Sequence, residues 1–212
     1  MEEKKKSGVR RRANAIKPFR CKNVIAVLED PTDIGNIGTV IRNVNALGIE
    51  KVYVVDQRGR LPGDWQDMRE RRSLSKTSVS AVKWTFVKRF DTTQDCIDHL
   101  STQNYRSVVT SPHVKGKENA YLDDVDFTPY PKLAVWFGNE SRGVSEAAVA
   151  NGELCVAIPM FGMIESLNLA TSSGIVLYEV AKQRRAYQSR YKRANKKSER
   201  ADPLPVVMEQ EK

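Results

Sequence analysis

Residues 154–181, LCVAIPMFGMIESLNLATSSGIVLYEVA, place a strand, a turn and a helix in one short stretch. Residues 154–158 are an apolar run typical of a buried strand, which Pro159 should end because it has no N–H for a sheet ladder. Gly162 then supplies flexible or positive-φ backbone for a turn. From Leu167 onward, apolar and small residues recur at helical spacing and also cover the opposite side. We therefore expect a helix that is buried nearly all round, in a core or in a subunit interface.

A polar triplet, Glu165, Ser166 and Asn168, lies between this strand and this helix. Open α/β sheets bind ligands beyond the carboxyl ends of their strands, which is where the triplet should lie. Taken alone, the triplet is explained better by a capped turn with Ser166 as the helix N-cap. Further motifs are needed before it can be assigned a function.

The chain has 212 residues, enough for one α/β domain with a sizeable core and additional tails. Its three cysteines, Cys21, Cys96 and Cys155, are far apart and odd in number, which favours reduced thiols over a metal knuckle or a redox pair. No apolar run reaches the length of roughly 18 residues that a membrane span needs, and the charged amino terminus does not fit a signal peptide. These features predict a soluble cytoplasmic protein with no membrane partner.

The net charge of +9 is concentrated at the two ends of the chain. Residues 1–22 carry a net charge of +7 and residues 182–200 carry +8, whereas residues 201–212 carry −2 and residues 23–181 carry −4. We therefore divide the chain into a basic arm (1–22), a mildly acidic domain (23–181) and a basic carboxy-terminal helix or tail (182–212). A charged arm can be merely solvated and disordered, but two arms of the same sign favour a polyanionic partner, nucleic acid rather than membrane.

Alternating strands and helices indicate a parallel sheet. Residues 24–28 should form the first strand, and a helix capped by Asn36 or a neighbour should run to about Leu47, where Gly48 ends it. Residues 51–55 give the second strand, and a strand, a helix and a strand in about 30 residues form a βαβ unit. The fold class is therefore α/β, with a parallel sheet flanked by helices. Later segments predict strands at 84–87, 107–110 and 133–137 and helices at 92–103 and 145–150.

Residues 57–82 are expected to form a long loop with a weak helical tendency. A long loop within a compact domain is usually functional. Its six basic residues outnumber three acidic ones, so a phosphate-facing loop is one interpretation and a solvated surface loop is the other. The basic residues are Arg58, Arg60, Arg69, Arg71, Arg72 and Lys76.

Familiar ligand motifs are absent from the sequence. No GxGxxG follows a strand and no GxxxxGK[ST] occurs, which argues against a dinucleotide-binding Rossmann domain and against a P-loop. His99 and His113 have no acidic or cysteine partner at metal-ligand spacing, so no metal is expected, and His99 is interpreted as a surface residue. No Ser-His-Asp arrangement is suggested.

Three segments at strand ends match a known family. Residues 36–42 (NIGTVIR), 137–145 (FGNESRGVS) and 158–168 (IPMFGMIESLN) resemble, in order and in spacing, the three motifs of the SpoU (TrmH) branch of SPOUT RNA methyltransferases. Each motif alone is weak, whereas the three together are specific, and the resemblance covers residues 22–185. One departure is the sequence Leu-Ala-Thr at 169–171, where many members have Val-Ser-Val, a change that should affect packing more than chemistry.

The resemblance implies an S-adenosylmethionine-dependent enzyme that methylates a ribose 2′-hydroxyl in structured RNA and works as a homodimer. It also implies a Rossmann-like SPOUT fold with a carboxy-terminal trefoil knot, an exception to the rule that chains do not thread loops. Members of the family bind the cofactor in the knot, largely through backbone groups. The matching positions in this chain are Thr110, Gly138, Ile158, Met160 and Leu167.

Arg42 is the expected catalytic residue by the same resemblance. Methyl transfer needs a deprotonated and aligned hydroxyl oxygen, so positioning should supply much of the rate. The guanidinium of Arg42 is not an ordinary base at neutral pH, but its planar fork can hold a phosphate and stabilise a developing alkoxide. Asn36, Glu140, Ser166 and Asn168 are expected to orient the arginine, the substrate or the cofactor. In unrelated proteins, Arg42 would form a surface ion pair and Asn36 would cap a helix.

The expected RNA contacts lie in the basic arms and in the arginine-rich loop, because the match implies no separate RNA-binding domain. Short family members with basic ends often modify a guanosine in the D-loop of transfer RNA, which is the leading substrate by analogy. The alternatives are ribosomal RNA, another transfer-RNA position, or an RNA-binding protein of the same fold without turnover. The expected RNA-binding residues are Arg10, Arg11, Arg12, Arg69, Arg71, Arg72, Arg184 and Arg185.

Overall fold

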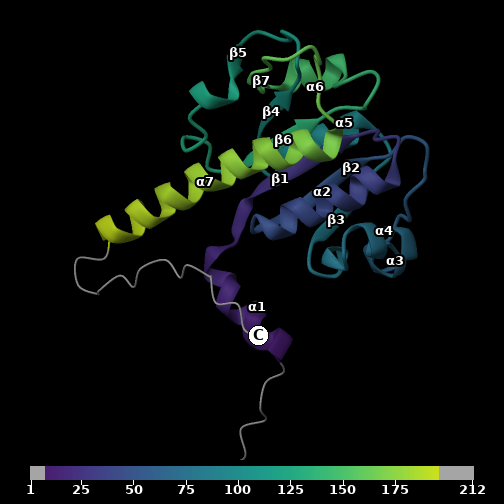
Figure 1. Ribbon diagram of the computed structural model, residues 1–212, viewed down its shortest axis with the longest axis vertical. Coiled ribbons are helices and arrows are strands. Elements are labelled where there is room, and N and C mark those ends of the chain that lie inside the picture. The colour runs from purple at the N-terminus through teal and green to yellow at the C-terminus, as the bar shows by residue number, and fades with distance from the viewer. Residues whose placement is uncertain (1–7, 196–212) are drawn as a thin grey trace, which may run out of the picture.

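The computed structural model describes residues 8–195, which form a parallel sheet with helices on both faces (Figure 1). The 7-stranded sheet has the order β3-β2-β1-β6-β4-β7-β5, and every neighbouring pair of strands is parallel. The expected α/β class is therefore confirmed. The strands are β1 (Cys21–Glu29), β2 (Ile49–Val55), β3 (Phe86–Phe90), β4 (Arg106–Thr110), β5 (Asn119–Tyr121), β6 (Leu133–Phe137) and β7 (Leu154–Ala157).

Helices cover the sheet on each side and bury a separate apolar cluster there. The larger cluster joins α2 and α7 to one face, and the smaller cluster joins α5 and α6 to the other. α1 points away from the sheet, so part of the expected basic arm is helical (Figure 1). The helices are α1 (Gly8–Ile16), α2 (Ile34–Ala46), α3 (Trp65–Glu70), α4 (Arg72–Thr77), α5 (Thr93–Thr102), α6 (Glu146–Asn151) and α7 (Leu169–Asn195), with short 3-10 turns at Lys17–Phe19, Ala81–Lys83 and Leu122–Asp124.

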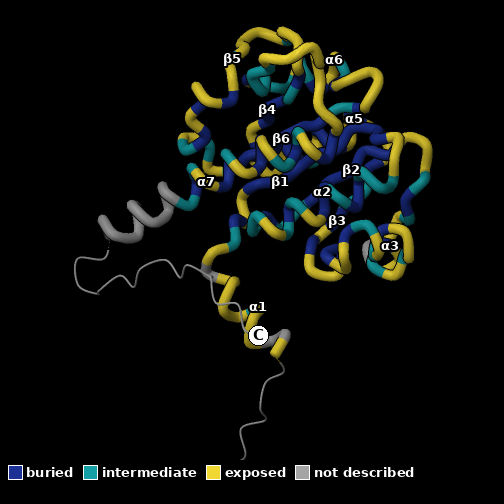
Figure 2. Tube along the Cα trace, viewed as in Figure 1, coloured by how far each residue is buried: buried dark blue, intermediate teal, exposed yellow. Residues whose placement is uncertain are grey.

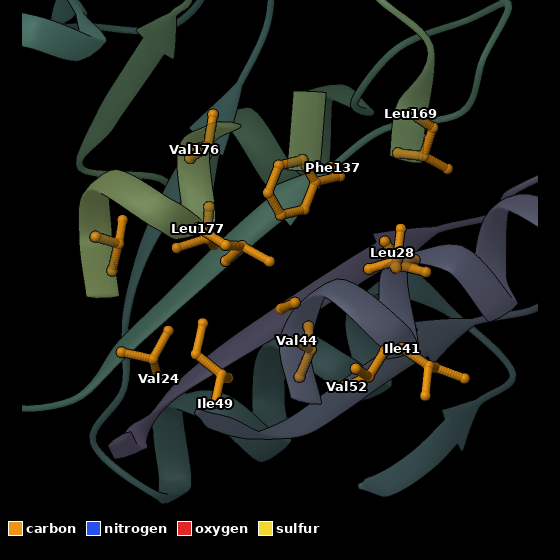
Figure 3. Packing of buried hydrophobic residues seen from close by; sticks show 14 of the residues in the cluster. Val24, Leu28, Ile41, Val44, Ile49, Val52, Phe137, Leu169, Val176 and Leu177 are labelled. Carbon is orange, nitrogen blue, oxygen red and sulfur yellow. The ribbon is translucent and has the colours of Figure 1, made fainter. Parts of the chain in front are cut away.

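β1 illustrates why this sequence forms a parallel sheet. Val24 and Leu28 belong to the cluster under α2 and α7, whereas Ile25 and Val27 belong to the cluster under α5. All four side chains are fully buried, and strands buried on both faces appear as continuous apolar runs rather than alternating ones. Figure 2 shows the central strands largely buried, and Figure 3 shows Leu28 in one cluster with Phe137 of β6, Leu169 of α7 and Ile41 of α2.

α2 fits closely between α4 and α7 because it carries small and polar residues at the contacts. A Cβ atom on Gly38 would lie 2.6 Å from the Cβ of Thr77 in α4, so only glycine permits this approach. Towards α7, Asn43 Nδ2 donates to the Ala170 carbonyl at 2.9 Å. Gly48, with φ of 77°, follows the end of the helix as predicted. The N-cap is Asp33, whose carboxylate accepts from the Gly35 N–H, and not Asn36.

Residues 154–181 differ from expectation in three details. β7 ends at Ala157, just ahead of Pro159, but Gly162 does not have positive φ. α7 is capped by Asn168, whose Oδ1 accepts from the Ala170 N–H at 2.8 Å, so Ser166 is not the N-cap. α7 is also not buried all round in the single chain, because Ile175 and Tyr178 are 40% and 54% exposed. One apolar face of this helix is therefore open to solvent.

Other predicted elements are confirmed with small shifts. The helices expected at 92–103 and 145–150 are α5 and α6, with Thr92 and Ser145 as their caps. The strand expected at 84–87 instead lies at β3, and Trp84 precedes it in an exposed position. The loop at 57–82 contains α3, α4 and a 3-10 turn, and β5 was not predicted.

Candidate active site

A pocket of about 440 Å³ opens at the carboxyl ends of β4, β6 and β7, beside the start of α7. Parallel α/β sheets usually bind ligands at this edge. Glu140, Ser166 and Asn168, from the second and third motifs, line the pocket. The structure thus brings segments far apart in sequence to one cavity. The five positions expected to bind cofactor also line it: Thr110, Gly138, Ile158, Met160 and Leu167.

Hydrogen bonds join one residue from each of the three motifs. Asn36 Nδ2, in the first turn of α2, donates to Glu140 Oε1 at 2.8 Å. Asn168 Nδ2 donates to Asn36 Oδ1 at 3.1 Å, and Asn168 is in turn the cap of α7. The side-chain amide of Asn36 therefore has both a donor and an acceptor role, which fixes its orientation. This chain of bonds couples α2 to two residues that line the pocket, Glu140 and Asn168, although Asn36 itself does not line it.

Glu140 is held in its ionised form. Burial raises the pKa of this carboxyl, but hydrogen bonds from the Thr32 N–H and the Asn36 amide outweigh burial and lower the pKa to about 2. The two bonds are both 2.8 Å long and use separate carboxylate oxygens. A carboxylate with so low a pKa is a poor general base at neutral pH. Glu140 is therefore suited to positioning Asn36 rather than to removing a proton.

The loop after β6 is shaped by a glycine and an asparagine. Backbone bonds of 3.0 and 2.8 Å pair Asn139 with Gly143, and a Cβ on Gly138 would lie within 2.5 Å of the Gly143 carbonyl oxygen. Asn139 Nδ2 donates to the Asp30 carbonyl at 2.7 Å, and its Oδ1 accepts from the Ser141 and Arg142 N–H groups. The second motif therefore encodes a tight loop that is tied to the end of β1.

Comparison with known proteins assigns the chain to a family. A family model described as the SpoU rRNA Methylase family matches residues 23–178. The chain belongs to this SpoU family. Among curated SpoU relatives, a tRNA (guanosine(18)-2′-O)-methyltransferase of Thermus thermophilus is 26% identical over 175 residues, which is 82% of each chain. The Escherichia coli K12 protein of the same name is 28% identical over 150 residues, covering 70% of this chain and 58% of that protein.

Solved structures of SpoU proteins share the fold. The Aquifex aeolicus TrmH/SpoU tRNA modifying enzyme has a TM-score of 0.69 at 24% identity, with 87% of each chain covered. The SpoU methyltransferase AviRb from Streptomyces viridochromogenes, solved in complex with AdoMet, has a TM-score of 0.64 at 27% identity, covering 78% of this chain and 62% of that one. The parallel sheet described above is thus a SpoU fold.

Arg42, the expected catalytic residue of the SpoU motif, does not line this pocket. It lies on α2 six residues after Asn36, which corresponds to about 9 Å along the helix axis and to a different face. The side chain is exposed, and within residues 8–195 it makes no ion pair with a carboxylate. Among the described residues, the surface ion pair considered from sequence is therefore not formed, and no hydrogen bond or salt bridge involves the guanidinium.

The pocket also contains residues that sequence reasoning did not assign to it. His113 and Lys115 belong to the connection after β4, whose irregular sequence gives no periodic signal. Asn139 and Arg142 are part of the second motif but had no expected role. Val176 lines the pocket from the second turn of α7, where it was interpreted only as a buried helix residue.

Two residues expected to bind RNA make hydrogen bonds within the chain, which contradicts the prediction for the buried Arg184 and leaves that for the half-exposed Arg71 a prediction. Arg184 is 7% exposed and donates to the carbonyl groups of Phe127, Tyr130 and Pro131. A buried guanidinium with these partners is not available to phosphate, so that expectation is wrong for Arg184. Arg71 donates to the Arg60 carbonyl and to Ser73 Oγ, which orders the arginine-rich loop.

The remaining expected RNA contacts stay predictions. Arg11 and Arg12 are exposed on α1, and Arg72 is exposed on α4. Arg69 is half-buried in α3, and Arg185 donates to the Leu47 carbonyl at 3.0 Å. The side chain of Arg10 lies outside the described part of the molecule, as do residues 196–212 of the carboxy-terminal tail.

Further observations concern metal binding, membrane spans, and the cysteine and histidine side chains. In the described range, no three His, Cys, Asp or Glu residues are arranged to hold a metal ion. None of the helices between residues 8 and 195 has the length and apolarity to cross a membrane. Cys21, Cys96 and Cys155 are free and buried, and His99 is half-buried with its ring near Tyr53 and Lys88 rather than at the surface.

Proposed function

We propose that this SpoU-family protein transfers a methyl group from S-adenosylmethionine to a ribose 2′-hydroxyl of RNA. The observation that carries the proposal is that Glu140 and Asn168, from the second and third motifs, line one pocket and are both hydrogen-bonded to Asn36 of the first motif. The leading substrate is guanosine 18 of transfer RNA, because curated relatives that cover most of the chain carry that name.

The pocket suits the proposed cofactor. Its volume lies in the usual range for small-molecule sites, which is about 300–1,000 Å³. Val156, Ile158 and Leu167 offer an apolar wall for a planar base, while the loop beginning at Gly138 brings backbone groups to the other side. A side chain at Gly138 would collide with this loop, so the cradle depends on glycine. The cofactor, once bound, supplies an activated methyl group on a sulfonium.

The chain's own residues have positioning and electrostatic roles in this proposal. Asn36 is fixed by Glu140 and Asn168 and orients the ribose or the cofactor from α2. Ser166 is exposed at the pocket wall, where its hydroxyl can contact the substrate. Arg42 binds the phosphate next to the reacting ribose and stabilises the developing alkoxide. Removing its guanidinium should abolish methylation.

We further propose that the protein is a homodimer and that the second copy brings its Arg42 to the pocket. The pocket of one chain does not contain its own Arg42. Exposed apolar side chains of the loop before α7 (Phe161, Met163 and Ile164) and of α7 (Ile175 and Tyr178) lie on segments that also line the pocket, and they offer contacts to a second copy. Patches of this kind on soluble proteins commonly mark protein contacts. The trefoil knot implied by the family and a cytoplasmic location remain part of the proposal.

A mixing experiment separates an Arg42 that acts within its own chain from one that acts across the dimer. Arg42→Ala and Gly138→Val variants are each expected to be inactive, the first without its guanidinium and the second without a cofactor cradle. If Arg42 acts across the interface, co-expressed heterodimers recover one working site, because the Arg42→Ala chain keeps an intact pocket. If Arg42 acts in its own chain, the heterodimer has no working site and activity stays at background.

The decisive test of the activity uses labelled S-adenosylmethionine with separately purified transfer RNA and ribosomal RNA, followed by mapping of the modified ribose. A single 2′-O-methyl at guanosine 18 is the expected product. Methylation of ribosomal RNA or of another transfer-RNA position would keep the reaction and replace the substrate. Binding of cofactor and RNA without any transfer would favour a non-catalytic RNA-binding protein. Arg42→Ala should lose methylation while keeping cofactor affinity, and substantial turnover would exclude its catalytic role.

The basic arms are proposed to supply RNA affinity that is not specific for sequence. Arg11 and Arg12 are exposed on α1, and lysines and arginines that contact phosphate release counterions, which makes binding depend on salt. Deleting residues 1–20 or 186–212 should weaken RNA binding and leave cofactor binding unchanged. Equal RNA affinity after both deletions would exclude this role.

A further inference from the structure

Asp30 is a buried carboxylate in an unusual backbone conformation at the end of β1. It is 4% exposed, and its φ of 45° lies in the left-handed region, which non-glycine residues other than Asn and Asp rarely adopt. The conformation is held from both sides. The Asp30 N–H donates to the Val55 carbonyl at 2.8 Å, and the Asp30 carbonyl accepts from Asn139 Nδ2 at 2.7 Å. The backbone therefore fixes where the Asp30 carboxylate points.

Three guanidinium groups converge on this carboxylate. Arg58 Nε lies 4.0 Å and Arg60 Nη2 lies 3.6 Å from it, and Arg142 Nη2 donates to its Oδ2 atom. Arg58 and Arg60 come from the segment after β2, whereas Arg142 comes from the loop after β6. Asp30 thus joins two parts of the chain that sequence analysis treated separately, the arginine-rich loop and the second motif.

These arginines divide into a buried and an exposed set. Arg60 is 23% exposed, pairs also with Asp56 at 3.4 Å, and donates to the carbonyl groups of Pro31 and Thr32. Arg60 is therefore committed to the structure. Arg58 and Arg142 are 58% and 63% exposed, and for each of them Asp30 is the ionic partner recorded among the described residues.

The exposed guanidinium groups around Asp30 carry more positive charge than the Asp30 carboxylate neutralises. Arg58 and Arg142 share one oxygen, Oδ2, of a carboxylate that Arg60 also approaches, so two exposed guanidinium groups are opposed by less than one negative charge. A guanidinium has five N–H donors in a planar fork that matches the oxygens of a phosphate. Both side chains are more than half exposed, and the one hydrogen bond from Arg142 to Asp30 leaves further donors for an anion.

The position of Arg142 links this charge to the reaction. Arg142 is among the residues that line the proposed cofactor pocket, and its side chain is exposed and reaches Asp30 beside the pocket. We propose that Arg58 and Arg142 bind a phosphate group of the substrate RNA at the mouth of the pocket, and that Asp30 positions both side chains. This inference rests on the proposed function, since it takes RNA as the substrate. Arg58 and Arg142 are binding residues, and Asp30 is a positioning residue.

The test compares the full-length double variant Arg58→Gln/Arg142→Gln with the wild-type protein in RNA binding at 50 to 200 mM salt. Each phosphate contact contributes roughly 0.7–0.9 to the slope of log affinity against log salt. Loss of this one phosphate contact should make the fall in affinity over this fourfold range about 2.6- to 3.5-fold smaller. S-adenosylmethionine affinity should change by less than about twofold, because guanidinium loss leaves the Arg142 backbone bond to Asn139 in place.

Arg106→Gln is the matched control. Arg106 is 66% exposed and has one ion pair, with Glu153 at 2.7 Å, but it begins β4 at the opposite edge of the sheet from the pocket. This variant should keep the wild-type salt slope. An unchanged slope in the double variant, or an equal change in Arg106→Gln, would overturn the phosphate site.

Asp30→Asn tests positioning separately from charge. Asparagine tolerates positive φ as well as aspartate does, so the backbone of Asp30 should be kept. Charge alone predicts tighter RNA binding, because a negative group is removed beside two arginines. If Asp30 positions the two arginines, the opposite is expected: the KM for RNA should rise about tenfold or more with little change in kcat. This pattern indicates a lost contact to bound RNA and not a lost interaction in the chemical step. Tighter binding would overturn the role of Asp30.

The two proposals can fail independently. If the wild-type protein binds RNA but methylates none, while the double variant binds RNA with a smaller salt slope, the proposed function fails and the phosphate site stands. If the wild-type protein methylates RNA and the double variant keeps both its salt slope and its KM, the phosphate site fails alone.

Discussion

Replacing Gly138 by alanine should disrupt the pocket through a steric effect that can be worked out from the structure. The added Cβ would lie within 2.5 Å of the Gly143 carbonyl oxygen, whereas real Cβ contacts essentially never fall under 3.0 Å. The obstructing atoms are backbone, so the loop itself must move. Overpacking of this kind costs about 1–3 kcal/mol, and each backbone bond between Asn139 and Gly143 that opens adds roughly 0.5–1.5 kcal/mol. If one of these two bonds opens, a total of about 2–4 kcal/mol is expected.

Two measurements check this prediction. If the loop keeps its native conformation, a cost of about 2–4 kcal/mol lowers the Tm of a protein of this size by about 4–16 °C. If the loop relaxes in the free protein and must be restored when the cofactor binds, the same cost weakens cofactor affinity by about 30- to 700-fold. The control is Gly162→Ala, because a Cβ on Gly162 meets nothing within 4 Å. That variant should be neutral or slightly stabilised, since alanine restricts the unfolded chain. A Gly138→Ala protein with wild-type Tm and cofactor affinity would refute the steric reasoning.

Two more predictions follow from named contacts. Glu140 has its pKa lowered to about 2, so its contribution to stability is present above its ordinary pKa of 4.5 and is lost as the pH falls toward 2. Glu140→Gln should therefore flatten the decline of the urea midpoint between about pH 5 and pH 3, and an identical decline would contradict this assignment. Arg184→Met removes the donors to three carbonyl groups and should cost about 2–4 kcal/mol, seen as a lower Tm, whereas the same change at exposed Arg11 should be neutral.

Much of the fold could be predicted because its central elements have local signals. β1, β2, β4, β6 and β7 are apolar runs that end at turn residues, and α5 and α6 have recognisable caps. β5 lacked such a signal because it is a three-residue edge strand with two exposed positions. β3 was misplaced because Lys88 and Arg89 interrupt its apolar pattern, while the preceding Trp84 appeared to begin it.

The site was predictable only in part because its contacts are between distant residues. The bond between Asn36 and Asn168 joins positions 132 residues apart, and no periodicity within either segment indicates it. Family resemblance identified both residues without giving their geometry. The buried role of Arg184 was missed because it lies within a basic run that, taken alone, favours a solvated surface. A count of charges in the sequence does not reveal which guanidinium groups donate their hydrogen bonds to backbone carbonyl oxygens.

The place of β6 between β1 and β4 affects how this protein emerges from the ribosome. β1 can pair with β2 early, but its other edge waits for β6, whose first partner residue, Leu133, follows Val24 by roughly 110 residues. At a synthesis rate of about 5–20 residues per second, that edge is open for about 5–20 seconds. An unpaired apolar strand edge is a site of aggregation. Nascent chains halted before residue 133 should therefore be the species that chaperones retain.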